Sequence, residues 1–197
     1  MGSGDSSATS GDKIAAMSGV LAFLAGLQLP VADNNWTDYV DASPKIGVRA
    51  GAVEGALAGM VSADFTPERL TAKTAMPFGA DVGASAYRFR FLAHLGFEHE
   101  VGPKLTLTAR VGAGLDLAHG SYDYTAAGVR FHSSDSDVGF AFEFGGGVWW
   151  DIGSAQIGGE LAMPIGNHDK ASQNGSVAFQ YTSYDIDMLF AVRMLSR

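Results

Sequence analysis

The sequence predicts an all-β protein, and more specifically an eight-stranded antiparallel up-and-down β-barrel that crosses a membrane through its strands. Three observations predict this fold. Seven segments alternate between apolar and polar side chains with a period of two residues, which is the period of a β-strand. The polar positions of these segments carry charges, whereas the opposite positions are nearly all apolar. The connections between the segments alternate between short turns and long loops, as they do in transmembrane barrels.

Composition limits the class of protein. A chain of 197 residues suits a single domain. Only 17% of the residues are charged and the mean hydropathy is +0.09, which fits a barrel in which half of each strand is polar better than a bundle of membrane helices. The net charge of −8 argues against a nucleic-acid partner, because phosphate binding needs clustered Lys and Arg. The absence of Cys excludes disulfides and thiolate metal sites.

The first predicted strand lies in the apolar stretch at residues 13–32, which has three interpretations. Acidic residues precede it where a signal peptide would carry basic ones. A membrane helix would have a suitable length but would contain glycines and Pro30. A strand over 20–29 alternates poorly, yet it closes the sheet, and lipid does not tolerate an open sheet edge. Closure therefore favours the strand, with 1–16 as a flexible tail and 17–197 as the barrel domain.

The other seven strands follow from the alternation itself. The stretch YRFRFLAHLGFEHE at 87–100 is the clearest example, because Tyr87 and Phe89 occupy one face while Arg88 and Arg90 occupy the other. The predicted strands cover residues 45–52, 57–65, 87–100, 105–117, 138–150, 155–163 and 184–194. Most of them reach the length of about 9–11 residues that a tilted strand needs to cross a bilayer.

The connections are predicted to sort by length. Short turns are predicted at 53–55, 100–104 and 151–154. Long loops are predicted at 30–44, 66–86, 119–137 and 166–183. Because antiparallel neighbours place every second connection on the same side, the four loops share one side of the membrane. The short turns share the other side with both ends of the chain.

The sequence resembles the small outer-membrane β-barrel superfamily of diderm bacteria, which includes the opacity-type and OmpA-type barrels. The resemblance covers roughly residues 18–194. It is carried by the eight strands, by the glycine-rich segments GVRAGAVEG, RVGAGLDL and FGGGVWWDIG, and by the turn VGPKL. It implies a location in the outer membrane, short periplasmic turns and long extracellular loops.

The polar parity is predicted to face the lumen and the apolar parity to face lipid. A soluble ligand-binding barrel would show the opposite arrangement. Charges inside so narrow a barrel must pair, and Arg110, Glu143 and Glu160 lie at similar heights, with Arg49 as a fourth member across the lumen. The predicted ion-pair network comprises Arg49, Arg88, Arg90, Arg110, Glu143, Glu160, Asp187 and Arg193. Inward Gly112, Gly114, Gly145 and Gly147 are expected to make room for the arginine stems. A filling that locks the barrel is favoured over a gated path for small ions.

Few residues suggest chemistry. His119 and Ser121 are weak catalytic candidates, because lipid A deacylases present a similar His-x-Ser pair on the outer face of a barrel, but no carboxylate is fixed to orient the base. Two acidic segments, 33–41 and 132–137, lack the spacing of a calcium loop and are expected to be solvated. No metal or cofactor is predicted.

Other polar and aromatic positions have structural interpretations. His94 is expected to hydrogen-bond Arg or Glu in the lumen. Trp149, Trp150 and Tyr184 are expected at the membrane interface, although Trp149 has inward parity.

The predicted function is structural or interactive, without catalysis. The barrel would contact outer-membrane lipid and offer its four loops to an extracellular partner. Two alternatives stay open: a lipid-modifying enzyme related in function to the lipid A deacylases, and a soluble lipocalin-like barrel that binds a ligand.

Overall fold

The computed structural model describes residues 17–31, 40–70, 82–126, 129–170 and 179–196. These residues form strands almost throughout. The strands are β1 (Ser18–Pro30), β2 (Val40–Asp41), β3 (Ser43–Glu54), β4 (Leu57–Leu70), β5 (Val82–Gly102), β6 (Leu105–Ala126), β7 (Val129–Asp151), β8 (Ala155–Lys170) and β9 (Phe179–Ser196). None of the described residues belongs to a helix long and apolar enough to span a membrane. The predicted tail at 1–16 lies outside the described residues.

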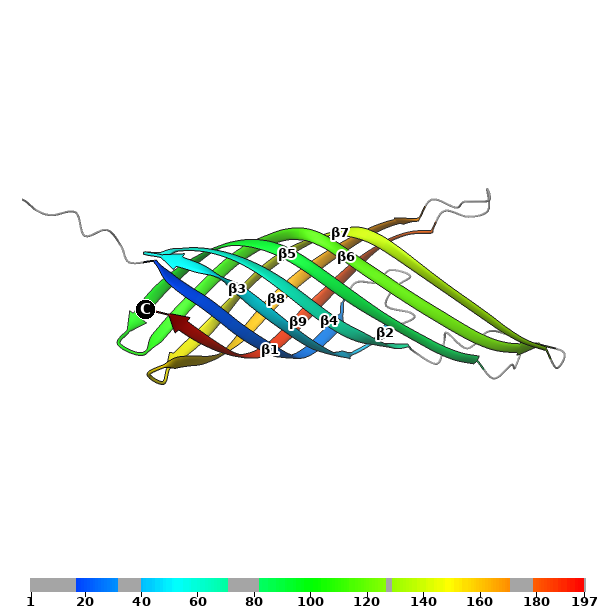
Figure 1. Ribbon diagram of the computed structural model, residues 1–197, viewed down its shortest axis with the longest axis horizontal. Helices are drawn as coiled ribbons and strands as arrows, with labels where there is room; N and C mark the ends of the chain where they lie inside the picture. Colours follow the sequence, from blue (N-terminus) through cyan, green and yellow to red (C-terminus); the bar gives the residue numbers. More distant parts are fainter. Residues whose placement is uncertain (1–16, 32–39, 71–81, 127–128, 171–178, 197) are drawn as a thin grey trace, which may run out of the picture.

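Eight of the strands form a closed antiparallel barrel, which confirms the predicted fold class (Figure 1). Each long strand pairs with its neighbours in the chain, and β1 pairs with β9 to close the ring. The two-residue strand β2 pairs only with β4 and continues the course of β3. No edge of the barrel wall is left open along the eight described long strands where they cross the apolar belt.

The predicted first strand is confirmed, and closure rather than local alternation identified it. Strand β1 pairs with β3 over eleven residue pairs, from Ser18↔Val53 to Gln28↔Ser43. On its other side it pairs with β9 from Gly19↔Ser196 to Pro30↔Asp185. Both ends of the barrel domain therefore lie on the same side, together with the short turns (Figure 1).

The tight turns use glycine where the backbone requires it. Gly55 follows β3 with a φ of 62° and Gly153 follows β7 with a φ of 104°. Residues with a Cβ atom rarely adopt these values, so a glycine at each turn lets the strand reverse within two or three residues. The side that holds these turns is called the turn side below, and the opposite side the loop side.

The predicted boundaries of the long loops are wrong, because the strands continue past the positions where the apolar pattern stops. Strand β5 starts at Val82, and β6 and β7 together occupy most of the segment predicted as the loop 119–137. The loops predicted at 66–86 and 166–183 likewise contain the ends of β4, β5, β8 and β9, and the loop at 30–44 contains β2 and the start of β3. Backbone pairing persists there although the outward side chains are no longer mainly apolar.

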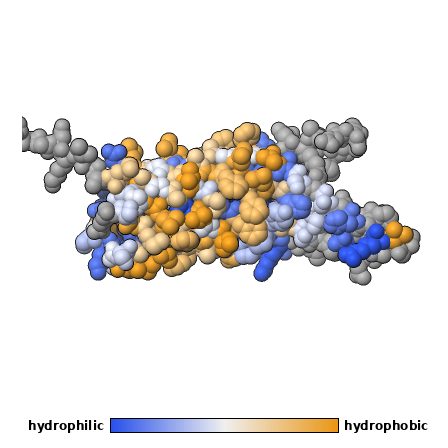
Figure 2. Space-filling model, in the orientation of Figure 1, coloured by the Kyte–Doolittle hydropathy of each residue, from blue (hydrophilic) through white to orange (hydrophobic). Residues whose placement is uncertain are grey.

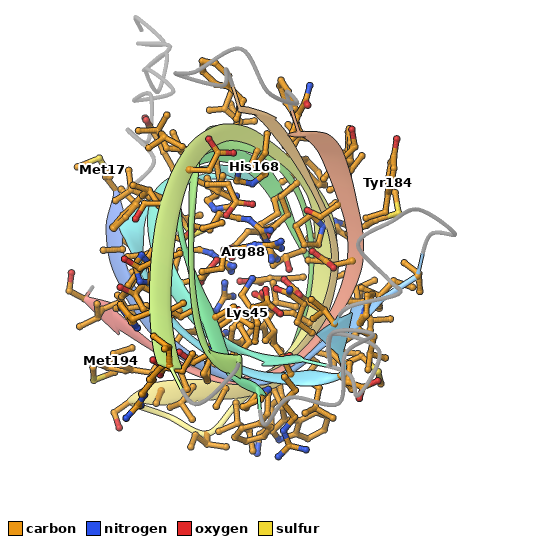
Figure 3. The ribbon with its side chains drawn as sticks, turned by 90° about the vertical axis from the view of Figure 1, so that its right-hand side faces the viewer. Met17, Lys45, Arg88, His168, Tyr184 and Met194 are labelled. Atoms are coloured by element: carbon orange, nitrogen blue, oxygen red, sulfur yellow. The ribbon has the colours of Figure 1, made fainter. Side chains whose placement is uncertain are left out.

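The two faces of the barrel wall have opposite polarity. Outward side chains form an apolar belt around its middle, and many are large and more than one-third exposed, such as Phe91, Phe142 and Phe190. Figure 2 shows this belt in orange, with more polar surface toward both ends. The inward side chains include many buried Arg, Lys, Asp and Glu residues. Figure 3 looks in from the loop side and shows Lys45, Arg88 and His168 inside the ring, whereas Tyr184 and Met194 lie outside it.

Candidate functional site

The centre of the lumen holds a four-membered ion-pair cluster, called the central cluster: Arg49, Arg110, Glu143 and Glu160. Arg110 Nη2 lies 3.0 Å from Glu143 Oε1, and Arg110 Nη1 lies 2.9 Å from Glu160 Oε2. Arg49 projects from β3, which lies across the lumen from β6 and β7, and its Nη1 lies 2.9 Å from Glu160 Oε1 of β8. Strands β3, β6, β7 and β8 each supply one member, so the sequence pattern brings together residues up to 111 positions apart.

The four inward glycines of β6 and β7 leave space for neighbouring groups, but only one of these neighbours is an arginine side chain. A Cβ atom on Gly145 would lie 3.1 Å from Arg110 Cζ, so this glycine faces an arginine. On Gly112 it would meet the His94 ring, and on Gly147 the Glu160 stem. On Gly114 it would meet the backbone oxygen of Phe91. The expectation that all four make room for arginine stems is therefore correct for Gly145 alone.

His94 extends the central cluster toward β4. Its Nε2 lies 2.9 Å from Ser62 Oγ, while its Nδ1 lies 3.9 Å from Glu143 Oε1. The expected hydrogen bond to an Arg or Glu is thus replaced by one to a serine. The ring is buried, at 3% exposure.

A second group, called the loop-side cluster, fills the lumen between the central cluster and the loop side: Lys45, Asp64, Arg88, Arg90, Asp116, His168, Asp185 and Asp187. Lys45 Nζ lies 2.5 Å from Asp187 Oδ2 and 3.4 Å from Asp64 Oδ2. These contacts join β3 to β9 and to β4. Lys45 and His168 were not among the residues predicted for the network.

The arginines of β5 hold the rest of the loop-side cluster together. Arg88 Nη1 lies 3.0 Å from Asp185 Oδ2, and Arg90 Nη2 lies 3.0 Å from Asp116 Oδ2. His168 of β8 contacts carboxylates on two other strands. Its Nδ1 lies 3.0 Å from Asp137 Oδ2 of β7, and its Nε2 lies 3.5 Å from Asp116 Oδ2 of β6. Strands β5, β6, β7, β8 and β9 therefore all contribute side chains to one buried polar layer.

A third group, called the turn-side cluster, lies at the other end of the lumen and centres on Arg193. Arg193 Nη1 donates to Glu98 Oε1 at 2.6 Å, and its Nε donates to Gln156. The guanidinium also lies over the Trp149 ring, 4.4 Å from its centroid. Trp149 is only 2% exposed and donates its indole N–H to Thr108. The expectation of an interface position is therefore wrong for Trp149, whose inward parity was the better guide.

Two spaces flank the turn-side cluster. A void of about 10 Å³ separates it from the central cluster, with Arg49, Arg110, Trp149 and Arg193 among its lining residues. This volume is close to what a single water molecule needs. An open vestibule of about 540 Å³ lies on the turn side, lined in part by Glu98, Glu100 and Arg193.

The two candidate catalytic side chains do not contact each other in a catalytic arrangement. His119 Nδ1 lies 2.8 Å from Ser136 Oγ of β7, whereas Ser121 Oγ lies 2.8 Å from Ser85 Oγ of β5. Tyr87 stacks on the His119 ring at 4.8 Å between centroids. Each candidate is thus bound to a different neighbouring strand.

The structure describes only some of the other polar and aromatic residues singled out from the sequence. Among the residues that the structure describes, no group of three or more His, Asp or Glu side chains is arranged to hold a metal ion. Asp33 and Asp38 lie outside the described residues. Trp150 and Tyr184 face outward and are about half exposed.

The comparison with solved structures identifies the fold. The amino-acid sequence matches no protein-family model and no curated protein. Among solved structures, the chain is similar to a major outer membrane protein from Thermus thermophilus, with a TM-score of 0.59 and 10% identity over 91% of this chain and 99% of that chain. It is also similar to Ail, the attachment invasion locus protein of Yersinia pestis, with a TM-score of 0.50 and 13% identity over 90% of this chain and 98% of that chain. The chain has the fold of the small eight-stranded β-barrels of the outer membrane of diderm bacteria, with an apolar outer belt and a charged lumen.

Proposed function

We propose that the protein is an outer-membrane anchor of a diderm bacterium that acts through its extracellular segments, with a lumen closed by ion pairs and with no catalytic activity. The observation that carries this proposal is the combination of an apolar outer belt with a lumen occupied by three charged clusters. On this proposal the turn side is periplasmic and the loop side extracellular.

The lumen contacts support closure. A barrel of eight strands is only wide enough for its own side chains. Side chains of the central cluster reach across the lumen from β3 to β8 at 2.9 Å, and those of the loop-side cluster reach from β5 to β9 at 3.0 Å. Opening a continuous path would leave such charges buried without partners, which costs several kcal/mol for each ion.

The loop side supports an interaction role. Strands β6 and β7 are 22 and 23 residues long, about twice the length needed to cross a bilayer. They carry a paired, ordered surface away from the membrane (Figure 1). Any extracellular partner would meet this surface and the connections within the predicted loops 30–44, 66–86, 119–137 and 166–183.

The two alternatives receive less support. A serine hydrolase needs a base within hydrogen-bond reach of its nucleophile and a group that orients the base. Ser121 contacts Ser85 instead of His119, and the group on His119 is a serine hydroxyl. A soluble lipocalin-like barrel would need an apolar interior, whereas this lumen contains buried charges.

Planar-bilayer recording tests the closed lumen. We expect no discrete conductance steps from the wild-type protein. The double variant Arg110→Ala/Glu143→Ala removes both partners of a central pair and should also give no steps, because the loop-side cluster still closes the lumen. Steps of similar size in both proteins would contradict closure. Hydrolysis of a lipid ester by wild type that disappears in Ser121→Ala would contradict the absence of catalysis.

A further inference from the structure

Three strands carry an ordered polar surface directly beyond the apolar belt. The register of β5, β6 and β7 places outward side chains in rows across the three strands. The last apolar row is Phe89, Leu117 and Val138. The next two rows toward the loop side are Tyr87, His119 and Ser136, and then Ser85, Ser121 and Ser134. These six residues are called the hydroxyl face.

Contacts within the hydroxyl face hold five of its six side chains. Ser85 and Ser121 share a hydrogen bond of 2.8 Å between β5 and β6. His119 and Ser136 share one of 2.8 Å between β6 and β7. The Tyr87 ring stacks on His119 with an interplanar angle of 27°. The face is therefore preorganised, which lowers the entropic cost of binding a ligand.

The chemistry of the hydroxyl face suits a neutral polyhydroxylated ligand. Five of its six side chains end in a hydroxyl, and each hydroxyl both donates and accepts hydrogen bonds. Tyr87 is 38% exposed and offers an aromatic surface with a polar tip. None of the six is Asp, Glu, Lys or Arg. Phosphate groups are bound mainly by Arg and Lys, so this face is not suited to a phosphate ligand.

The charges nearest to the hydroxyl face compensate one another. Asp123 and His132 form the next outward row, with Asp123 Oδ1 3.0 Å from His132 Nδ1. Arg130 Nη2 lies 3.5 Å from Asp123 Oδ2. This charged group marks the outer limit of the face.

The position of the hydroxyl face identifies the source of the ligand. It continues the lipid-facing surface without a gap, since Tyr87 follows Phe89 and His119 follows Leu117 on the same parity. Rows on one parity are about 7 Å apart and three strands span about 10 Å, so the two rows match a small oligosaccharide at headgroup height. Toward the loop side the surface turns from apolar to polar (Figure 2).

We infer that the hydroxyl face binds the sugar headgroup of a glycolipid in the surrounding outer leaflet. The inference rests on the proposed insertion of the barrel into the outer membrane. It adds that the inserted barrel binds one class of lipid, the glycolipids, through the hydroxyl face. Tyr87 packs against a sugar ring, and the hydroxyls of Ser85, Ser121 and Ser136 exchange hydrogen bonds with its hydroxyl groups.

Nuclear magnetic resonance of the full chain in lipid nanodiscs tests this inference. The probes are digalactosyl diacylglycerol added to phosphatidylcholine nanodiscs, and free digalactose added to nanodiscs of phosphatidylcholine alone. We expect the glycolipid to shift the backbone amide signals of Ser85, Ser121 and Ser136 in a saturable way. The double variant Ser85→Ala/Ser121→Ala should weaken this binding about tenfold, because it removes hydrogen bonds to the ligand. Asn167→Ala is the matched control, since Asn167 is an outward polar residue of β8 outside the face.

Each outcome decides the inference. Saturable shifts that weaken in the double variant and persist in the control support it. Equal responses in the double variant and the control, or no saturable shift, overturn it. Equally strong binding of free digalactose would overturn the assignment to a membrane lipid and indicate a soluble glycan. Failure to enter nanodiscs at all would instead reject the proposed function, which incorporation of the wild-type protein checks separately.

Discussion

Glu143 is a buried carboxylate of the central cluster, and its loss should destabilise the barrel. Its Oε1 accepts hydrogen bonds from both Nε and Nη2 of Arg110, at 3.1 and 3.0 Å, and the side chain is 2% exposed. Removing Glu143 leaves Arg110 and Arg49 to share the single carboxylate of Glu160, so one buried positive charge loses its compensation, which is more costly than replacing a whole pair by apolar groups.

We therefore expect Glu143→Ala to lower the free energy of unfolding by about 3–5 kcal/mol. Equilibrium urea unfolding in lipid vesicles measures this change. Glu100→Ala is the control, because Glu100 is exposed at the vestibule and should matter little. An unchanged stability of Glu143→Ala would contradict the central cluster.

Glycine at position 114 permits the close approach of two strands. A Cβ atom there would lie 1.9 Å from the backbone oxygen of Phe91, so the strand would have to shift. Gly114→Ala should lower the stability by about 1–3 kcal/mol, as overpacked sites do. Gly59→Ala, where a Cβ would meet nothing within 4 Å, should be nearly neutral. Equal melting temperatures of the two variants would count against this explanation.

Parity predicts which side chains enter the lumen better than it predicts their partners. Counting positions from the short turns was enough to group Arg110, Glu143 and Glu160, because antiparallel register fixes their relative heights. It could not assign His94 to Ser62, since a long side chain inside a narrow barrel can lean toward several strands. It also could not pair Lys45 of β3 with Asp187 of β9, a contact over the intervening strand β1 between residues 142 positions apart.

At the scale of elements, the long strands β6 and β7 combine two environments. Their turn-side halves alternate apolar residues with residues that are mostly polar, charged or glycine, which is why the sequence predicts them as strands. Their loop-side halves alternate polar with polar, so no period is visible there although the ladder runs without interruption from Leu105↔Trp150 to Ala126↔Val129. His168 was missed as a lumen residue for the same reason, since it falls in a segment predicted as a loop.

The loop-side end of this hairpin contains a carboxylate, Asp123, that is hydrogen-bonded to His132 and lies beyond the apolar belt. The hydrogen bond from His132, with a smaller contribution from Arg130, lowers the pKa of Asp123 below its ordinary value of 3.8. A lowered pKa means that the ionised carboxylate stabilises the folded hairpin at pH values above about 4. This contribution disappears as the pH falls through the lowered pKa.

His132→Ala should therefore raise the pKa of Asp123 toward 3.8. The carboxyl carbon signal of Asp123, followed by nuclear magnetic resonance during an acid titration, gives the midpoint. His119→Ala serves as the control, because His119 contacts Ser136 and not Asp123. The hydrogen bond has no role if the midpoint is the same in all three proteins.

The whole molecule is defined by closure and by its reversed polarity. The pairing of β1 with β9 and of β4 with β5 joins the eight long strands into one ring. The first strand was predictable only at this scale, because its own alternation is weak and an open edge in lipid is excluded. The apolar belt and the charged lumen follow from the same parity, which makes the barrel dependent on lipid or detergent.

The most direct test of this account is the mobility of the purified protein in an SDS gel, with and without boiling, after refolding into detergent. A closed barrel with an apolar belt should stay folded in SDS at room temperature and migrate at a different position from the boiled, unfolded chain. The same mobility in both lanes, together with a folded protein in buffer without detergent, would contradict the assignment of the apolar face to lipid and the charged face to the lumen.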